Sequence, residues 1–398
     1  MIWDYSEMKK TFLALAVAAV AAASVAQAAT VYDKDGTSLA VYGRVQSVIY
    51  NGDNSSSSDY NDNSMDTSAR LGLDMRTQLA PWVAGFGKVE WEAANGDTGE
   101  DDDDFNGRYL WVGFDFGQFG SVKFGKFEDA IKYAIAPTDI FEDFGCVAQL
   151  GNDDRRSGQM MYEWSGYGVD VKLSASTASE NQQVDGAYYS DAEGSEDLDI
   201  NTGFAASIGY TSPDVLFGPI GVRVGYSYAQ FQDGDDENKT NGYNRTKYMY
   251  DDYNQWAASL SWGGDVGFYT AVMYSNRDFN LYDSLNGNAI KFYDDYSVQG
   301  VEFVVRYTFQ NGISVFGGYQ WQNIDMDGAK AAKAYDDYGR DLDASTVNLE
   351  VDWQVNPNFK IWTEARWDVD TDEGYDTLSN GVTNYEEDCY SVGARYTF

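Results

Sequence analysis

The sequence predicts an all-β fold, a transmembrane up-and-down antiparallel β-barrel of about 16 strands. From Ser38 onward, stretches of about ten residues alternate apolar with polar or small side chains and then break. The breaks alternate between short turns and long loops. The composition agrees, because 40 Gly and 16% aromatic residues with only 5 Pro favour many strands joined by tight turns. No segment has a helical period of useful length.

The only long apolar run lies near the N-terminus and has the layout of a secretory signal peptide. Met8-Lys9-Lys10 supplies a positive region, Phe12 to Ala23 an apolar region, and Ala26-Gln27-Ala28 a small-residue cleavage motif. We therefore expect residues 1–28 to be a signal region, with the true start at Met8 and cleavage after Ala28. A membrane anchor helix is the alternative, but the run is rich in Ala and ends in a cleavage site rather than in charges.

The remaining chain, residues 29–398, has no linker, and its pattern of alternating apolar and polar residues does not change along the chain. We therefore expect a single barrel domain. Its candidate strands, in order, are 38–50, 68–80, 82–94, 107–116, 120–127, 158–164, 169–177, 202–210, 220–230, 254–262, 267–276, 297–307, 313–322, 345–354, 360–368 and 390–398.

The connections between these strands fall into two classes. Short ones contain turn residues, as in Ala80-Pro81 and Asn311-Gly312. Long ones are acidic: residues 96–106 hold six acids, and residues 178–201 and 369–388 hold seven acids each with no Lys or Arg. Short turns at one end and long loops at the other are typical of a transmembrane barrel, whose strand number is even if both termini lie at the short-turn end.

Residue parity predicts which face of each strand meets lipid. In the last strand, Tyr390, Val392 and Tyr396 share one parity, and Arg395 has the other. An Arg near the bilayer midplane costs about 2–4 kcal/mol on the lipid face, so the aromatic set must face outward. The same test places Tyr42 inward. Inward polar residues on most strands predict a wet lumen, and this strand number leaves room for an aqueous channel.

Composition excludes several other functions. The chain has Asp+Glu 64 against Lys+Arg 27, a formal net charge of −37, and no histidine. It therefore lacks a Ser-His-Asp triad and a His general base, and so acidic a surface does not bind nucleic acid non-specifically. Glu90 and Asp143 could do acid–base chemistry, but nothing positions a nucleophile, so we expect no enzyme and no cofactor.

Two further alternatives concern metal ions and the fold. The run Asp101–Asp104 lacks the spacing of a calcium loop, so we expect no dedicated metal site, although acidic loops could bind Ca²⁺ or Mg²⁺ diffusely. A secreted β-sandwich binding protein would also have alternating strands. It would not usually combine a signal peptide, alternating short and long connections, and a terminal Tyr-x-Phe strand.

Several motifs resemble the general diffusion porins of Gram-negative outer membranes. They are Val41-Tyr42-Gly43-Arg44, Ala69-Arg70-Leu71-Gly72, the segment 85–91, the segment 119–126 and the closing Tyr396-Thr397-Phe398. The resemblance is specific over the first third and the last strand. It implies a homotrimer of sixteen-stranded barrels in the outer membrane, each with a long third loop folded into its lumen. It also implies that Phe398 is the assembly signal for the barrel-assembly machinery, and that lipid and lipopolysaccharide surround the barrel.

The resemblance also implies a set of pore residues. The third loop should be Glu128 to Gly158, with an acidic segment opposite a ladder of basic residues on the wall. The acids carry over to Asp139, Glu142 and Asp143, although the proline of the family is absent there and Cys146 replaces its second glycine. The basic ladder carries over to Arg44, Arg70, Arg108, Lys126 and Arg155. Other residues expected to line the pore are Tyr42, Lys88, Glu90, Glu350, Trp362 and Glu364.

These residues predict how the pore would select solutes. Closely set inward Arg residues repel one another, which a lumen tolerates only with water and opposing carboxylates nearby. We expect passive diffusion of ions and small hydrophilic solutes with a moderate cation preference, because loop acids outnumber loop bases. The alternative is a substrate-selective channel, for instance for oligosaccharides, which would need aromatic platforms such as an inward Trp362. Cys146 and Cys389 could form a disulfide that tethers the loop to the wall.

Overall fold

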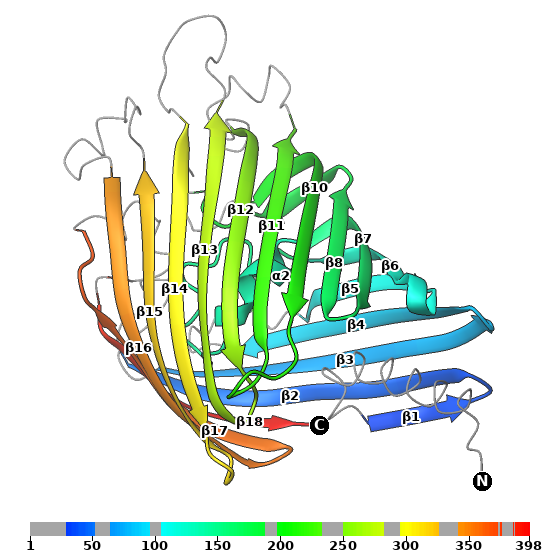
Figure 1. Cartoon of the computed structure of the whole chain (residues 1–398), viewed down its shortest axis with the longest axis horizontal. Coiled ribbons are helices and arrows are strands. Elements are labelled where there is room, and N and C mark those ends of the chain that lie inside the picture. Colours follow the sequence, from blue (N-terminus) through cyan, green and yellow to red (C-terminus); the bar gives the residue numbers. More distant parts are fainter. Residues whose placement is uncertain are drawn as a thin grey trace, which may run out of the picture.

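The strands close into one antiparallel barrel in the computed structural model, which describes residues 29–51, 64–95, 105–187, 197–232, 250–281, 295–325, 341–372, 375, 385 and 387–398. Strand β18 pairs with β2, and β8 pairs with β10. Of the eighteen strands in the sheet, β1 and β9 stand outside this ring, which leaves sixteen. The predicted barrel is confirmed (Figure 1).

The strands of the ring overlap every candidate range. They are β2 (Thr37–Asn51), β3 (Ser64–Ala80), β4 (Val83–Asn95), β5 (Asn106–Asp115), β6 (Ser121–Phe127), β7 (Arg156–Gly166), β8 (Val169–Ser176), β10 (Asp197–Thr211), β11 (Ile220–Phe231), β12 (Tyr250–Gly263), β13 (Gly267–Leu281), β14 (Tyr296–Thr308), β15 (Ile313–Asp325), β16 (Asp341–Asn356), β17 (Phe359–Asp368) and β18 (Cys389–Thr397). The signal region lies outside the described residues.

Two strands were not expected. β1 (Ala29–Lys34) forms a hairpin with β2, and β9 (Ser179–Gln183) continues along the same edge of β10 that β8 pairs with. The β1–β2 hairpin turns at Asp35 and Gly36, with φ of 53° and 75°. Two successive residues with positive φ make the tight turn that matches the twist of adjacent strands.

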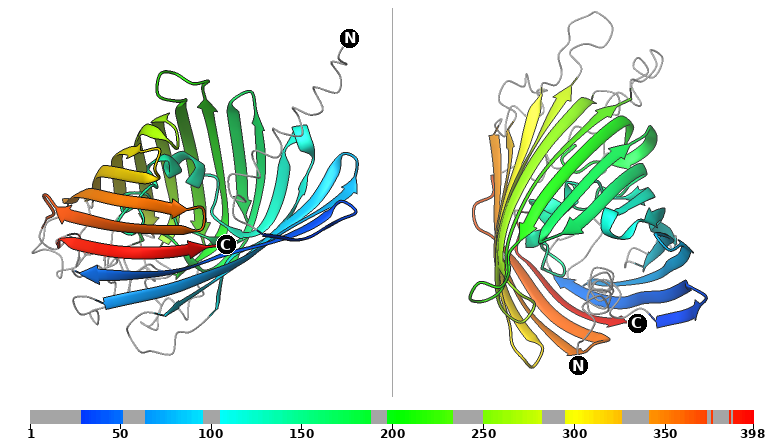
Figure 2. Two further views of the ribbon diagram at one scale, coloured as in Figure 1. Left: turned by 90° about the horizontal axis from the view of Figure 1, so that it is seen from below. Right: turned by 45° about the vertical axis from the view of Figure 1, so that its right-hand side comes forward.

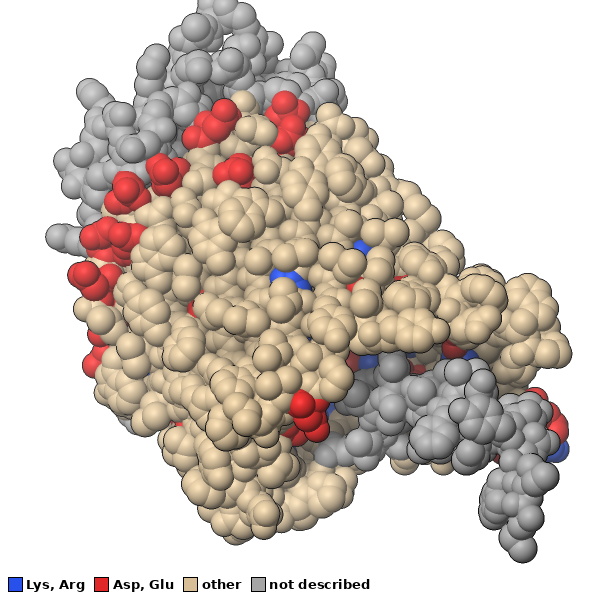
Figure 3. All heavy atoms as spheres, viewed as in Figure 1, with Lys and Arg blue, Asp and Glu red and all other residues tan. Residues whose placement is uncertain are grey.

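The outer face of the barrel is apolar, as residue parity predicts. Val45, Ile49, Val392 and Tyr396 are 43–60% exposed, although they are large and hydrophobic. Figure 3 shows one side of the barrel, where charged residues are nearly absent over the strands and acids gather toward the long-loop end. Such a band suits contact with lipid.

The interior is partly filled, which is consistent with the expected third loop in the lumen. The connection from β6 to β7, residues 128–155, folds into the ring and is called the inserted loop below (Figure 2). It contains α2 (Lys132–Ile135) and η2 (Ala136–Thr138), and a further short helix, η1 (Gly117–Phe119), turns between β5 and β6. Ile131 and Ile135 pack on Met273 of β13.

A second, larger apolar cluster fills the long-loop end of the barrel. Leu150 of the inserted loop packs there with Val184 and Ala187, which follow β9, and with Tyr375 and Tyr385. Aromatic side chains at the strand ends complete it. Three connections therefore fill the interior from the long-loop side. Among the described residues, no helix is both long and apolar enough to cross a membrane.

The ring closes where the last residue meets β2. The backbone groups of Gly43 and Phe398 exchange two hydrogen bonds of 2.9 Å. A Cβ on Gly43 would lie 2.5 Å from the carbonyl oxygen of Arg70 and 2.7 Å from the Phe398 ring, closer than real Cβ atoms approach. Only glycine allows the C-terminal ring to lie here.

We expect Gly43→Val to impair barrel closure, because the new side chain would displace Phe398 or the neighbouring strand. The heat-modifiable, folded band in detergent electrophoresis should fall well below the wild-type fraction. Gly317→Ala is the matched control, since its Cβ would meet only Val305 at an ordinary 3.5 Å. Equal folded fractions for the two variants would contradict this account of closure.

Candidate functional site

The tip of the inserted loop is held by buried glutamates on the barrel wall. Glu364 of β17 accepts hydrogen bonds from the backbone N–H groups of Asp143 and Phe144, at 2.8 and 3.0 Å. Glu350 of β16 accepts one from the N–H of Glu142 at 3.0 Å. Backbone groups inside a barrel need such partners, because an unsatisfied one is costly when water is excluded.

Glu302 of β14 holds the next part of the loop in the same way. Its carboxylate accepts hydrogen bonds from the N–H of Ala148 at 3.1 Å, the Thr138 hydroxyl at 2.6 Å and the Gln149 amide at 2.8 Å. Gln320 of β15 adds a reciprocal pair, accepting from the N–H of Val147 and donating to the carbonyl of Phe144, both at 3.1 Å. The loop therefore follows the wall from β14 to β17.

This arrangement changes the role of three residues that were expected to line the pore. Glu350, Trp362 and Glu364 are 0%, 3% and 1% exposed. They face inward, as predicted, but the inserted loop covers them, so they anchor the loop instead of lining open space. The Trp362 indole N–H donates to Asp143 at 2.6 Å.

The three acids expected on the loop, Asp139, Glu142 and Asp143, have different partners. Glu142 forms ion pairs with Lys360 and Arg395, at 2.6 and 2.5 Å. Burial opposes its ionisation, but these two cations outweigh burial and hold the pKa of Glu142 below its usual value. Glu142 is therefore a charged link between the loop tip and the wall.

Asp143 and Asp139 have other partners. Burial raises the pKa of Asp143, against hydrogen bonds from the Ser391 and Trp362 side chains. Asp139 pairs with Lys132 of its own loop at 3.1 Å. Neither carboxylate forms an ion pair with the basic ladder among the described residues, so their placement opposite the ladder across the pore stays a prediction.

The basic ladder surrounds a carboxylate on the wall that was not anticipated, Glu92 of β4. Arg44 lies 3.9 Å from it, and Arg70 and Arg108 form closer ion pairs with it. Arg108 also pairs with Glu90 at 3.2 Å. These side chains, the three arginines and Glu92, are 17–25% exposed, unlike the buried anchors on β16 and β17. Solvent therefore reaches the β2–β5 side of the interior.

A β-bulge turns Arg108 into the barrel. In the β4–β5 ladder, Glu90 pairs with Tyr109 and Trp91 with Gly107, so Arg108 is the extra residue. Strict alternation would place Arg108 on the same face as the outward-facing Leu110. Bulges commonly re-aim a side chain in this way.

The same wall carries Tyr42 and Lys88, and Arg155 lies at the end of the inserted loop, close to Tyr109 of this wall. The Tyr42 hydroxyl donates to Glu90 at 2.8 Å, and the Lys88 ammonium lies 4.6 Å from the Tyr42 ring centre. Arg155 pairs with Asp153 at 2.8 Å and Glu128 at 3.2 Å.

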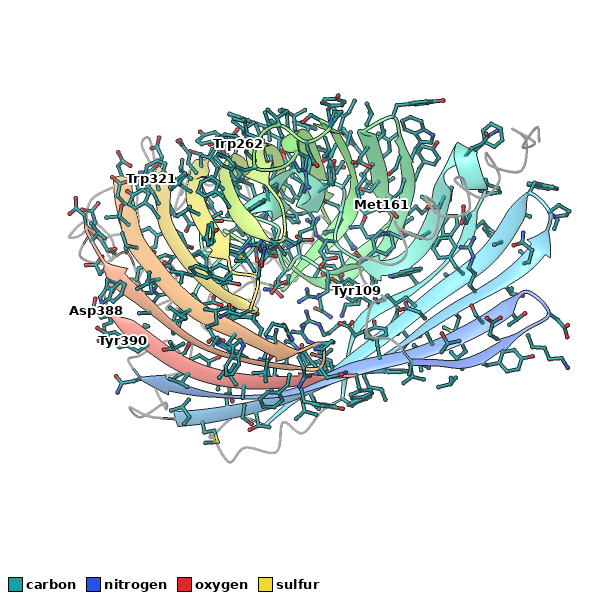
Figure 4. The ribbon with its side chains drawn as sticks, turned by 60° about the horizontal axis from the view of Figure 1, so that its bottom comes forward. Tyr109, Met161, Trp262, Trp321, Asp388 and Tyr390 are labelled. Atoms are coloured by element: carbon teal, nitrogen blue, oxygen red, sulfur yellow. The ribbon has the colours of Figure 1, made fainter. Side chains whose placement is uncertain are left out.

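Two residues complete this side of the interior. Tyr109, which is labelled in Figure 4, donates to Glu128 at 2.7 Å. Lys126 lies near Arg108 and Arg155 and has no ion pair within the described residues.

A buried joint fixes the far end of the inserted loop. Arg277 of β13 contacts Asp154 at 3.2 Å and donates to the carbonyl of Asp185 at 2.6 Å. Asp154 and Asp185 also accept backbone hydrogen bonds from each other's segments. Burial, followed by the charge of Asp154, raises the pKa of Asp185. One guanidinium thus ties the loop to the segment that follows β9.

Some of these residues could have been found in the sequence. Glu92 shares the parity of Glu90, and Lys360 shares the parity of Trp362, so both could have been placed inward. Nothing local identifies Glu302 or Arg277 as loop anchors. Among the described residues, no group of three or more His, Cys, Asp or Glu could hold a metal ion. The acidic run Asp101–Asp104, considered for diffuse cation binding, lies outside them.

The suggested disulfide is not formed, which corrects that expectation. Neither Cys146 nor Cys389 is part of a disulfide in the described structure. The Cys146 thiol donates a hydrogen bond to Asp139 at 3.0 Å. The Cys389 sulfur accepts one from the Arg366 guanidinium at 3.3 Å, so the two side chains have different neighbours. Burial, followed by the charge of Asp139, raises the pKa of Cys146 well above its usual value.

We therefore expect two thiols per chain to react in unreduced, denatured protein. In the folded protein Cys146 should react with a maleimide far more slowly than a free thiol, because its thiolate is suppressed. Mass spectrometry after labelling would count the adducts, with a reduced sample as the control. A count of zero in the unreduced sample would mean that a disulfide does form.

Comparison with known proteins agrees with this architecture. A model of the Gram-negative porin family matches residues 14–398. The outer membrane porin PhoE of Klebsiella oxytoca is 28% identical over 364 residues, covering 88% of this chain and 93% of that protein. The PhoE porin of Citrobacter freundii is 27% identical over 403 residues, covering 98% and 100%.

Solved structures share the fold. Salmonella typhi OmpF, determined in complex with daunomycin, matches with a TM-score of 0.68 at 18% identity, over 93% of this chain and 100% of that one. An anion-selective porin from Comamonas acidovorans matches with a TM-score of 0.57 at 12% identity, over 91% and 100%. The chain therefore belongs to the Gram-negative porin family, whose members are outer-membrane channels for the diffusion of small solutes and not enzymes.

Proposed function

We propose that solutes pass between the tip of the inserted loop and the basic wall of β2–β5. The observation that carries this proposal is the difference in exposure between the two sides of the interior. Anchors on β16 and β17 are buried, whereas Arg44, Arg70 and Glu92 keep a fifth to a quarter of their surface exposed. The Glu142–Arg395 ion pair, 2.5 Å across, lies at the loop tip near Arg44. Opposite charges on two sides of a narrow opening orient polar solutes.

We also propose a moderate cation preference. The support is the charge distribution: the net charge is −37, and long acidic connections such as residues 369–388 carry seven acids without a base. In contrast, cations and carboxylates in the described interior largely pair with one another. Anion selectivity occurs on the same fold in the Comamonas acidovorans protein, so the sign depends on side chains, not on the barrel.

A substrate-selective oligosaccharide channel is the less favoured alternative. It would need accessible aromatic faces, and Trp362 is only 3% exposed. The Arg395 guanidinium lies 5.1 Å from its ring centre, and Asp143 takes its indole N–H. These contacts leave no free face on Trp362 for a sugar to stack on.

The assembled form is proposed from the resemblance. It is a homotrimer in lipid and lipopolysaccharide, with the signal region of residues 1–28 removed during export. Phe398 is the proposed signal for the barrel-assembly machinery, and its exposed ring at the seam of the barrel supports that role. Detergent extraction followed by mass measurement of the native oligomer would test the trimer.

Replacing Arg44 and Arg70 together with Ala should raise both conductance and cation preference. The change removes bulk and two positive charges beside Glu92, and a rise of about twofold in the K⁺/Cl⁻ permeability ratio is expected. Reversal potentials in a KCl gradient measure it. Lys34→Ala is the control, because Lys34 lies on the β1 hairpin outside the ring. Anion preference in the wild type would contradict the proposed sign.

Glu364→Ala should loosen the tip of the inserted loop. It removes two charge-assisted hydrogen bonds, each worth about 1.5–3 kcal/mol, from the N–H groups of Asp143 and Phe144. Single-channel recordings should have a larger and noisier conductance, and liposomes should admit larger sugars. Glu180→Ala is the matched control, since Glu180 is exposed on β9. Unchanged conductance in Glu364→Ala would mean that the loop does not limit passage.

A further inference from the structure

A row of four cations follows the inner wall at the short-turn end, away from the residues described above. They are Lys123 of β6, Lys172 of β8, Arg223 of β11 and Arg306 of β14. Each lies within four residues of the turn that begins or ends its strand. Their pairing partners face inward: Lys172 lies opposite the buried Ser207, Arg223 opposite Ser259 and Arg306 opposite Phe316.

Shared neighbours connect Lys123, Lys172 and Arg223 of this row. Glu163 of β7 pairs with Lys123 at 3.3 Å and Lys172 at 2.7 Å. Lys172 and Arg223 then lie over the same ring, that of Tyr133 in the inserted loop, at 5.5 and 4.4 Å from its centre.

Tyr269 continues the row toward β14. Arg306 lies 5.1 Å from its ring centre. Lys123, Lys172 and Arg223 therefore share neighbours from β6 to β11, and Arg306 lies at the same end of the barrel on β14.

The row has more positive charge than its partners neutralise. Glu163 serves two lysines, and Asp170, which accepts hydrogen bonds from the Tyr133 and Ser165 hydroxyls, adds one further negative charge, so the four cations face fewer carboxylates. Arg223 has no carboxylate within 4.0 Å among the described residues; its guanidinium donates only to the carbonyl of Tyr133, at 3.1 Å.

Arg306 is similarly short of partners. It donates to the carbonyl of Gly264 at 3.0 Å and reaches the fully exposed Asp265 only at 4.0 Å.

Both arginines also keep a spare donor. The Nε atoms of Arg223 and Arg306 are buried without a hydrogen-bond partner in the described structure. A guanidinium presents its N–H groups in a fork that matches the oxygens of an oxyanion. Two such groups at the same end of the barrel, in an interior where charges are weakly screened, favour a doubly charged anion over chloride.

We propose that this row binds small divalent oxyanions as they cross the channel. The site rests on the channel function and lies on the short-turn side of the inserted loop, apart from the Arg44–Arg70 wall. Its ligand class is a compact group with two negative charges and several oxygen acceptors, for which sulfate is the simplest probe. The acidic connections at the other end would favour cations, so the two ends of the pore would hold opposite ions.

Sulfate titration of single channels tests the site. Recordings at about 0.1 M ionic strength keep the screening length near 10 Å. Replacing chloride by sulfate at constant ionic strength should reduce wild-type conductance in a saturable manner. Arg223→Gln should raise the half-blocking sulfate concentration about tenfold, as expected for loss of a charged hydrogen bond. Arg306→Gln should act in the same direction.

Arg76→Gln is the matched control. Arg76 lies near the same end, on β3, and has its own ion pair with Asp115 at 2.6 Å, so its loss should leave the half-blocking concentration within about twofold. Block that is absent, unsaturable, or weakened equally by Arg76→Gln would overturn the site. A channel that fails to conduct KCl would instead overturn the function, so the two failures are distinguishable.

Discussion

The pore of this porin depends on one physical constraint: a loop folded inside a barrel must find acceptors for its backbone N–H groups. The wall supplies them as carboxylates, with Glu302, Glu350 and Glu364 on β14, β16 and β17. A carboxylate is a strong acceptor and can serve two donors at once, as Glu364 does. The path of the loop, and hence the place where the interior stays open, follows from where these three residues lie.

This arrangement also explains why charged residues inside the barrel have two different roles. Glu302, Glu350 and Glu364 on β14–β17 are buried and make structural contacts with the loop, whereas the arginines and Glu92 on β2–β5 pair with one another and keep partial contact with solvent. Arg277 has the first role on β13, where it joins two connections through Asp154 and Asp185. Inward polar character alone therefore does not identify a pore-lining residue.

The strands and their orientation could be predicted because the relevant signal is local. A period of two, together with the cost of an arginine in lipid, is sufficient to orient Arg395 and Tyr396 correctly. The contacts of the loop could not be predicted, since Glu364 lies 221 residues beyond Asp143 in the chain. Arg108 reaches the interior through a bulge that alternation does not reveal. The suggested Cys146–Cys389 bond failed for the same reason, because it depended on the long-range position of the loop.

The long separation between the inserted loop and its anchors has a consequence for folding order. Residues 128–155 emerge from the ribosome and enter the periplasm well before β14–β18, which carry every glutamate that holds the loop tip. Until those strands pair, the backbone N–H groups of the tip bond to water, and turning inward gives them no acceptor on the wall. Because β18 must also meet β2 to close the ring, the narrowest part of the channel can take its final shape only in the last stage of assembly.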